Sequence, residues 1–367
     1  MIDLRRSPLL HWTVLVPLVA AVALALTWGK KPAAVVVAVV AALLIGAVLA
    51  AVHHAEVVAH RVGEPFGSLI LAVAVTVIEV GLIITLTLSG GPETGTLARD
   101  TVFAAVMITV NGIAGLSLLL GALRYGTVLF NPEGSGAALT TVITLATLSL
   151  VLPTFTKEPG PQFSPGQLTF AAVASLVLYG LFVFTQTKRH RSFFLPVLEE
   201  GIVDPYAGGE DESTPTRRMA WTSLGLLLVA LVSVVGLAKV ESPAIEAGVR
   251  AAGFPQSFVG VVIALLVLSP ETLAAARAAL RERIQISLNL AFGSAMASIG
   301  LTIPVMALAS VWLPGELLLG LGPTQLVLLI LTVAVSILTV VPGRALRLQG
   351  AVHLILLAAF LFLAINP

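Results

Sequence analysis

The sequence predicts an all-α, polytopic membrane protein with about 11 transmembrane helices, two inverted five-helix repeats following one extra N-terminal helix. Hydrophobic residues make up 57% of the 367 residues and charged residues 11%, whereas soluble proteins carry roughly 25% charged residues. The mean hydropathy is +1.03. Because a soluble fold of this size still leaves much of its surface in water, the composition excludes soluble enzymes, disordered chains and nucleic-acid binders.

Apolar runs of membrane-spanning length supply the predicted helices, since a helix needs about 20 largely apolar residues to cross a bilayer. The runs lie at residues 10–28, 33–53, 65–89, 101–122, 137–153, 166–187, 219–238, 255–276, 284–312, 323–341 and 346–365. They lack the alternation of apolar and polar residues that a membrane β-barrel needs. Arg5 and Arg6 before the first run are also typical of a signal peptide, but the run is long and Lys30 and Lys31 follow it, which favours a retained helix.

The distribution of Lys and Arg predicts the orientation. The connections on the side of the N-terminus hold more than twice as many Lys and Arg as those on the other side. Because positive loops stay in the cytoplasm, we expect a cytoplasmic N-terminus and an external C-terminus, in a bacterial inner membrane. The expected domains are residues 1–32 (extra helix), 33–187 (first repeat), 188–218 (a charged cytoplasmic loop) and 219–367 (second repeat).

The two repeats show matching motifs. Gly63-Glu64-Pro65 precedes the third predicted helix, and Gly253-Phe254-Pro255 precedes the eighth. Each motif leads into an apolar helix with one deep acid, Glu79 at 16 residues from its glycine and Glu271 at 18. An odd number of helices in each repeat inverts the second relative to the first, an arrangement typical of secondary transporters with a central binding site.

Glu79 and Glu271 are therefore the predicted ion-binding residues. A charge in the middle of a membrane helix is costly and usually marks an ion or proton path. A carboxylate oxygen is a hard ligand for Na⁺, K⁺ or Ca²⁺, and the same group can instead hold a proton. This competition couples a cation flux to a proton flux. The alternative is structural, with each acid protonated or paired with a buried donor.

Four polar neighbours are second-tier ligand candidates. Thr76 lies three residues before Glu79 and shares its helix face. Ser269 and Pro270 precede Glu271, and the proline predicts either a helix break that frees carbonyl ligands or a simple kink. Asn111 and Asn289 stand in apolar surroundings, where interhelical hydrogen bonding is the equally supported alternative.

The remaining observations narrow the function class. The sequence has no cysteine and no P-loop, H-E-x-x-H or G-x-S-x-G motif, so a hydrolase, a membrane protease or an ATP-driven pump has no support. No resident cofactor and no nucleic-acid partner are expected. The expected partners are membrane lipid and the transported cations and protons, and the sequence leaves homo-oligomer formation open. His53, His54 and His60 near Glu56 indicate an interfacial segment, pH sensing or a metal site.

These motifs resemble the cation/proton exchangers of the calcium/cation antiporter superfamily, in particular the bacterial calcium (sodium, potassium)/proton branch. The run from Gly63 to Glu79 is similar to that family's first signature, and Val267–Glu271 to its second. Arg281, Arg283, Gly293-Ser294 and Ile303-Pro304-Val305 stay in register with the family's K-x-K, G-S and I-P-V. The resemblance covers essentially the whole chain and implies that both glutamates are the membrane-embedded acids.

The departures from the family pattern bear on the cation. Leu71, Thr76 and Leu268 replace family asparagines, and Ser294-Ala295-Met296-Ala297 replaces a polar S-S-T-Q. This ligand set is thinner than that of the eukaryotic-type calcium exchangers, which weakens the case for Ca²⁺ selectivity and strengthens the case for Na⁺ or K⁺. The resemblance also implies that the central loop senses or collects cations, with a solvated linker as the alternative; its acidic residues are Glu199, Glu200, Asp204, Glu210, Asp211 and Glu212.

The expected function is secondary active antiport, exporting cytoplasmic Ca²⁺, Na⁺ or K⁺ in exchange for protons through alternating access. Two alternatives remain at this point. One is a sodium/calcium exchanger without proton coupling, and the other is a passive cation channel with a gating loop.

Overall fold

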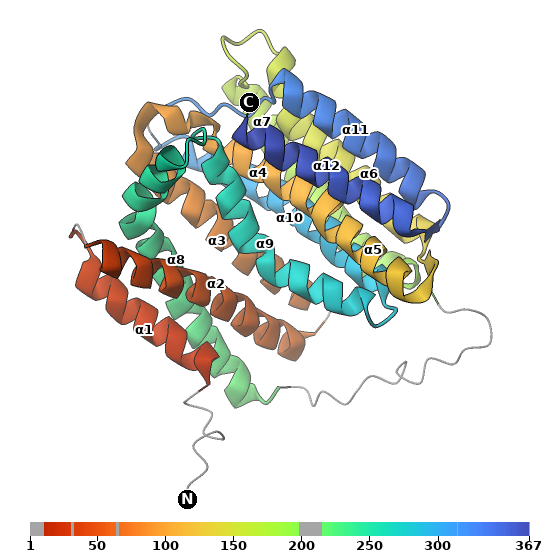
Figure 1. The fold of residues 1–367 in the computed structure, drawn as a ribbon, viewed down its shortest axis with the longest axis horizontal. Coiled ribbons are helices and arrows are strands. Elements are labelled where there is room, and N and C mark those ends of the chain that lie inside the picture. The colour runs from red at the N-terminus through yellow and green to blue at the C-terminus, as the bar shows by residue number, and fades with distance from the viewer. Residues whose placement is uncertain (1–10, 31–32, 64–65, 198–214, 314, 367) are drawn as a thin grey trace, which may run out of the picture. The chain divides into compact units, whose positions relative to one another are not determined.

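The computed structural model describes residues 11–30, 33–63, 66–197, 215–313 and 315–366, which form a nearly all-helical chain (Figure 1). Its α-helices are α1 (Trp12–Thr27), α2 (Ala34–Val62), α3 (Phe66–Gly90), α4 (Leu97–Met107), α5 (Ala114–Tyr125), α6 (Pro132–Ala146), α7 (Pro165–Phe184), α8 (Arg217–Ala251), α9 (Phe258–Ala279), α10 (Ile284–Ala309), α11 (Pro323–Val340) and α12 (Arg347–Ile365). A π-helical segment, η4 (Ile108–Ile113), joins α4 to α5 without a break. The eleven predicted helical segments are thus confirmed.

Shorter elements extend or connect these helices. π-helical turns η5 (Thr147–Val151) and η7 (Thr185–Arg189) continue α6 and α7. The 3₁₀ turns are η3 (Gly91–Thr96), η6 (Leu152–Phe155) and η8 (Arg191–Phe194). Two short strands, β1 (Val128–Leu129) and β2 (Arg344–Ala345), pair antiparallel. They join the connection after α5 to the connection after α11.

The helices are built for a bilayer. Within the described residues, 10 helical segments are long and apolar enough to cross a membrane, and α1 is a shorter apolar helix of 16 residues. The outer face of α7 carries large apolar side chains three or four positions apart: Phe170, Val173, Val177, Leu181 and Phe184, each more than half exposed. Such a stripe would be an aggregation surface in water but matches lipid tails. The chain is an integral membrane protein.

The chain divides into two compact units. Unit 1 comprises residues 1–94 and 211–256 and contains α1, α2, α3 and α8. Unit 2 comprises residues 95–210 and 257–367 and contains α4–α7 and α9–α12. Each unit takes helices from both repeats, because α8 of the second repeat joins α2 and α3 of the first.

In unit 1, a buried histidine fixes the relative depth of three helices. His54 of α2 is hydrogen-bonded through Nε2 to the Thr13 carbonyl of α1 (2.8 Å) and through Nδ1 to the Ser223 hydroxyl of α8 (3.2 Å). Towards the other end of α1 and α8, Gly236 lies against Leu24. α1 and α8 therefore run parallel, and α2 runs antiparallel to both.

α2 and α8 are longer than the apolar runs predicted. The expected helices at 33–53 and 219–238 stop before polar segments, whereas the observed helices continue to Val62 and Ala251. Two of the polar side chains find partners elsewhere in unit 1: the buried His54 as above, and the exposed Lys239, whose ammonium lies 5.0 Å from the centre of the exposed Trp28 ring. Both helices then meet a glycine with φ +75, Gly63 or Gly253, a left-handed conformation that favours glycine.

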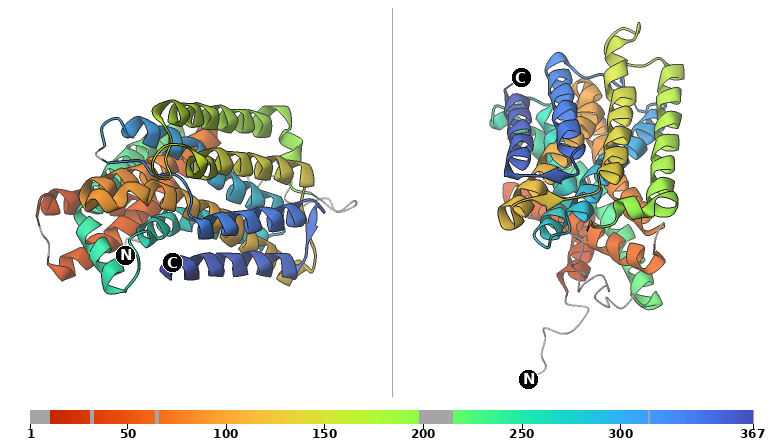
Figure 2. Two further views of the ribbon diagram at one scale, coloured as in Figure 1. Left: turned by 90° about the horizontal axis from the view of Figure 1, so that it is seen from above. Right: turned by 90° about the vertical axis from the view of Figure 1, so that its right-hand side faces the viewer.

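Unit 2 is built around the segment α4–η4–α5. All six residues of η4 and nearly all of α4 are buried, as expected for a helix that is apolar on every side. α9, α10 and α12 pack against this segment, and α10 also packs against α6 and α7. α11 and α12 lie side by side and antiparallel, joined by the connection that holds β2 (Figure 2).

Candidate ion-binding site

Glu79 lies near the middle of α3, in unit 1, with 3% of its surface exposed. Thr76, one turn earlier, is 5% exposed. Its hydroxyl has no hydrogen-bond partner among the residues that the structure describes. A residue three positions away lies on the same helix face, so α3 holds an uncommitted hydroxyl oxygen beside a buried carboxyl. These two groups are the part of the predicted site that the structure brings together.

Glu271 lies in α9, in unit 2, with 8% of its surface exposed. The predicted break at Pro270 is wrong, because α9 runs without interruption from Phe258 to Ala279. Proline lacks an N–H, so it leaves the carbonyl of Leu266 without its usual helical donor. The Ser269 hydroxyl donates to that carbonyl at 2.8 Å. Ser269 is itself exposed and, two positions before Glu271, points to a different side of the helix.

Asn111 belongs to a buried polar network in unit 2. Its amide donates to the Thr332 hydroxyl (2.9 Å), and its carbonyl oxygen lies 2.9 Å from His353 Nδ1. Since that oxygen can only accept, Nδ1 carries the proton. His353 Nε2 lies 3.2 Å from the Thr339 hydroxyl. The network ties η4 to α11 and α12, and both ends of the Asn111 amide already have protein partners.

Asn289 of α10 is half-buried at the edge of unit 2. It accepts a hydrogen bond from Gln285 (2.9 Å) and donates to the Phe194 carbonyl (2.7 Å). The side-chain oxygen of Gln285 in turn accepts a hydrogen bond from the backbone N–H of Asn131 (2.7 Å), next to the start of α6. Asn289 therefore ties η8 to α10, and its ligand role stays a prediction.

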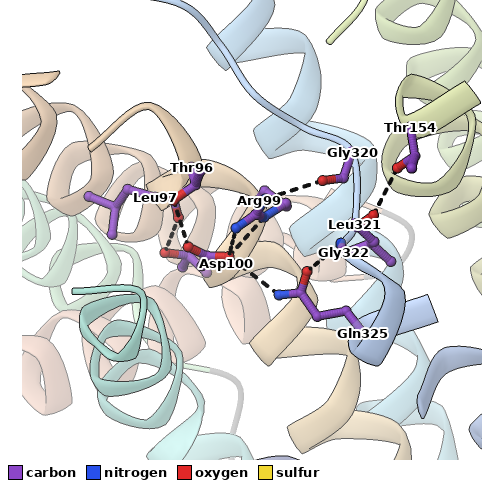
Figure 3. Close-up of polar contacts among 10 residues, drawn as sticks. Thr96, Leu97, Arg99, Asp100, Thr154, Gly320, Leu321, Gly322 and Gln325 are labelled. Atoms are coloured by element: carbon purple, nitrogen blue, oxygen red, sulfur yellow. Dashed lines mark hydrogen bonds and ion pairs between the residues drawn. The ribbon is translucent and has the colours of Figure 1, made fainter. Parts of the chain in front are cut away.

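Sequence reasoning missed Asp100, a buried acid in the first turn of α4 (Figure 3). One carboxylate oxygen accepts from Arg99 Nε and Nη2, both at 2.8 Å, and the other accepts from the Thr96 hydroxyl at 2.8 Å. Gln325 adds a weaker bond at 3.4 Å, and Arg99 donates to the Gly320 carbonyl at 3.2 Å. The guanidinium balances the charge of Asp100, so this cluster fastens the connection before α11 to α4.

A second missed acid is Glu241 of α8, with 2% of its surface exposed. Both acids lie just outside predicted helices: Asp100 precedes the helix predicted at 101–122, and Glu241 follows the helix predicted at 219–238. The polar run from Lys239 to Pro243 concealed the continuation of α8. A repeat alignment of α8 (35 residues) with α2 (29 residues), which also extends beyond its apolar run, was the available signal. The acidic residues predicted to be regulatory, Glu199, Glu200, Asp204, Glu210, Asp211 and Glu212, lie outside the described residues.

Comparison with known proteins gives consistent matches along the chain. The sequence profile of the family described as sodium/calcium exchanger protein matches residues 32–188 and 222–366. The protein y4hA of Sinorhizobium fredii, named as an ionic transporter, is 45% identical over 370 residues, which cover 100% of this chain and 99% of that protein. ChaA of Escherichia coli, named a sodium-potassium/proton antiporter, is 36% identical over 354 residues, 95% of this chain and 94% of that protein.

Among solved structures, native YfkE is similar in fold. The match has a TM-score of 0.72 at 17% sequence identity and covers 97% of this chain and 99% of that chain.

Proposed function

The chain belongs to the sodium/calcium exchanger protein family, and from this premise we propose that it is a secondary active antiporter that exports a cytoplasmic cation in exchange for protons. The family is one of transporters rather than enzymes. The structural observation that carries the proposal is Glu79, a carboxyl buried in the middle of a membrane helix next to the uncommitted hydroxyl of Thr76. A carboxyl in that position can hold either a proton or a cation, and this competition couples the two fluxes.

Glu79 and Glu271 are the shared cation and proton ligands in this proposal. Each is buried within a membrane-spanning helix, and each helix follows a left-handed glycine at the corresponding place of its repeat. Thr76 is the first neutral ligand to consider. Asn111, Ser269 and Asn289 are weaker candidates, because each already makes a hydrogen bond within the protein.

A monovalent cation, Na⁺ or K⁺, is the substrate class that we favour. ChaA, with 36% identity, is named for sodium, potassium and protons. Leu71 and Leu268 stand where the family has asparagines, so the site has fewer oxygen ligands. This favours a cation other than Ca²⁺, because Ca²⁺ takes six to eight oxygen ligands. The transport would take place in the bacterial inner membrane, with the N-terminus in the cytoplasm.

The test is a pH-gradient assay in inside-out vesicles that contain the full-length protein. Addition of NaCl or KCl should dissipate the acid interior, and CaCl₂ should be less effective. Glu79→Gln and Glu271→Gln should abolish the response, because an amide can neither bind a proton nor neutralise a cation. Glu133→Gln is the matched control, since Glu133 is exposed in the first turn of α6.

The alternatives give different results in the same vesicles. Cation uptake that is driven by a sodium gradient and leaves the pH gradient intact would identify sodium/calcium exchange. Uptake that does not saturate and is not coupled to protons would identify a channel. Full antiport by both glutamine variants, at normal expression, would overturn the assignment of the two acids.

A further inference from the structure

Glu241 is a buried acid that the proposed transport site does not use. It lies in α8, 24 residues after the helix begins, and its Oε1 has no hydrogen-bond partner among the described residues. Buried polar atoms are normally paired, and an unpaired carboxyl oxygen in a membrane protein is costly. Such a group indicates a ligand that the protein chain does not itself provide.

The charged groups close to Glu241 along α8 are directed elsewhere. Lys239 lies over the Trp28 ring, and Glu246 accepts a hydrogen bond from the Ser242 hydroxyl at 3.3 Å. A residue two positions away points to nearly the opposite side of a helix, so Lys239 does not share the face of Glu241.

Among the described residues of α1, α2 and α3, which pack on α8, no Lys or Arg lies at the depth of Glu241. α1 contains no charged or titratable residue, and the exposed Lys30 follows its end. The titratable residues of α2 begin at His53, next to the His54–Ser223 contact, which lies 18 residues of α8 away from Glu241. α3 contains Glu79 as its one charged residue.

Glu241 and Glu79 lie at different depths of the same bundle. α3 starts just after α2 ends, at the Ser223 end of α8, so α3 and α8 run in the same direction, and Gly81 of α3 lies against Val235 of α8. Glu79 is two residues before this contact and Glu241 is six residues after it. With a rise of 1.5 Å per residue, the two acids are separated by about 12 Å along the helix axes.

We propose that Glu241 is a second ion-binding carboxylate of unit 1, which takes a proton or monovalent cation on its way between the solution at the Ala251 end of α8 and Glu79. The inference rests on the proposed antiport function. On the predicted topology this end of α8 faces outwards, so Glu241 receives the entering proton and the departing cation. Its uncommitted Oε1 is the ligand atom.

Chemical labelling tests the site without relying on transport. Dicyclohexylcarbodiimide is an apolar reagent that reacts with protonated, buried carboxyl groups. The first adduct rearranges to a stable N-acylurea, and peptide mass spectrometry identifies the modified residue. In the purified full-length protein we expect modification at Glu241, reduced at least threefold by 100 mM NaCl or KCl relative to choline chloride. Modification of Glu79 without modification of Glu241, or labelling of Glu241 that neither salt changes, would overturn the proposal.

Transport supplies the second measurement. Glu241→Gln should slow cation/proton exchange at least tenfold, whereas Glu241→Asp should retain part of the rate. Glu246→Gln, on the same helix, is the matched control and should behave like the wild type. Thermal unfolding of each purified variant separates loss of an ion site from loss of folding, and the aspartate variant keeps the test valid if the glutamine variant fails to fold.

The outcomes distinguish this inference from the function on which it rests. If the wild type exchanges none of the cations for protons, the antiport proposal fails while the labelling still reports on Glu241. If the wild type is active, Glu79→Gln is inactive and Glu241→Gln matches the wild type, then Glu241 is not on the ion path.

Discussion

At the scale of single residues, the hydroxyl of Thr76 differs from those of several other buried threonines among the described residues, although Thr302 likewise has no hydrogen-bond partner. Thr101 and Thr109 donate to the carbonyl four residues before them, and so does the half-buried Thr272. Thr76 makes no such bond. An oxygen that the helix has not used stays available to a ligand, and here it lies one turn from Glu79.

We predict that Thr76→Val weakens cation binding. Valine has nearly the same shape but no oxygen, so the apparent KM for the transported cation should rise roughly five- to tenfold, corresponding to about 1–1.4 kcal/mol. Thr76→Ser restores the hydroxyl and should restore KM. Steady-state exchange measured over a range of cation concentrations checks this, and an unchanged KM in the valine variant would remove Thr76 from the site.

The acids also show what the sequence could and could not predict at this scale. Glu79 and Glu271 interrupt long apolar runs, so their burial followed from hydropathy alone. Asp100 lies in the first turn of α4 and Glu241 lies just beyond the apolar run of α8, where a polar residue is equally compatible with solvent. Their burial depends on partners or packing remote in sequence, such as Gln325 for Asp100, and no local pattern encodes that.

At the scale of elements, two helices of unit 2 depend on paired glycines. A Cβ on Gly350 of α12 would lie 2.5 Å from the Leu119 amide nitrogen and 2.8 Å from the Gly115 carbonyl oxygen, both in α5. A Cβ on Gly115 would in turn lie 2.6 Å from the Cβ of His353. The obstructing atoms include backbone atoms, which cannot rotate away, so the close crossing of α5 and α12 requires glycine.

Gly350→Ala should therefore destabilise the protein by about 1–3 kcal/mol, the usual cost of overpacking. The matched control is Gly180→Ala on α7, where no atom lies within 4 Å of the added Cβ. Alanine there should leave the melting temperature unchanged or raise it, because glycine costs roughly 0.5–1 kcal/mol in a helix interior. Thermal unfolding in detergent measures both, and equal melting temperatures for the two variants would contradict the packing argument.

The helices themselves were more predictable than their irregularities. Apolar runs located every long segment, but the π-helical η4 and the intact α9 at Pro270 did not follow from them. Side-chain hydrogen bonds accompany both: Asn111 links η4 to Thr332 and His353, and Ser269 bonds the carbonyl that Pro270 leaves without a donor.

At the scale of the whole molecule, the expected orientation can be tested because the chain has no cysteine. Single cysteines at Glu133, in the first turn of α6, and at Glu158, shortly after η6, would lie at opposite ends of the segment formed by α6, η5 and η6, and both positions are exposed. A membrane-impermeant maleimide should label Glu158→Cys in right-side-out vesicles and Glu133→Cys in inside-out vesicles. The reverse pattern would invert the predicted topology, and with it the direction assigned to Glu241.

The repeats were predictable at this scale, whereas the compact units were not. Matching Gly-x-Pro motifs and deep acids identify the repeats from the sequence. The units depend on which helices pack together. Which helices pack together depends on complementary surfaces between residues far apart in the chain, such as Gly81 against Val235.

The composition of unit 1 has a consequence for biosynthesis. α1, α2 and α3 leave the ribosome first, but their bundle lacks its fourth helix until α8 has been translated, 161 residues after Gly90. At ordinary elongation rates this interval is roughly 8–32 s. Until Ser223 itself has been translated, His54 lacks this partner in the nascent chain. Insertion machinery or lipid must shelter the incomplete bundle until the second half of the chain arrives.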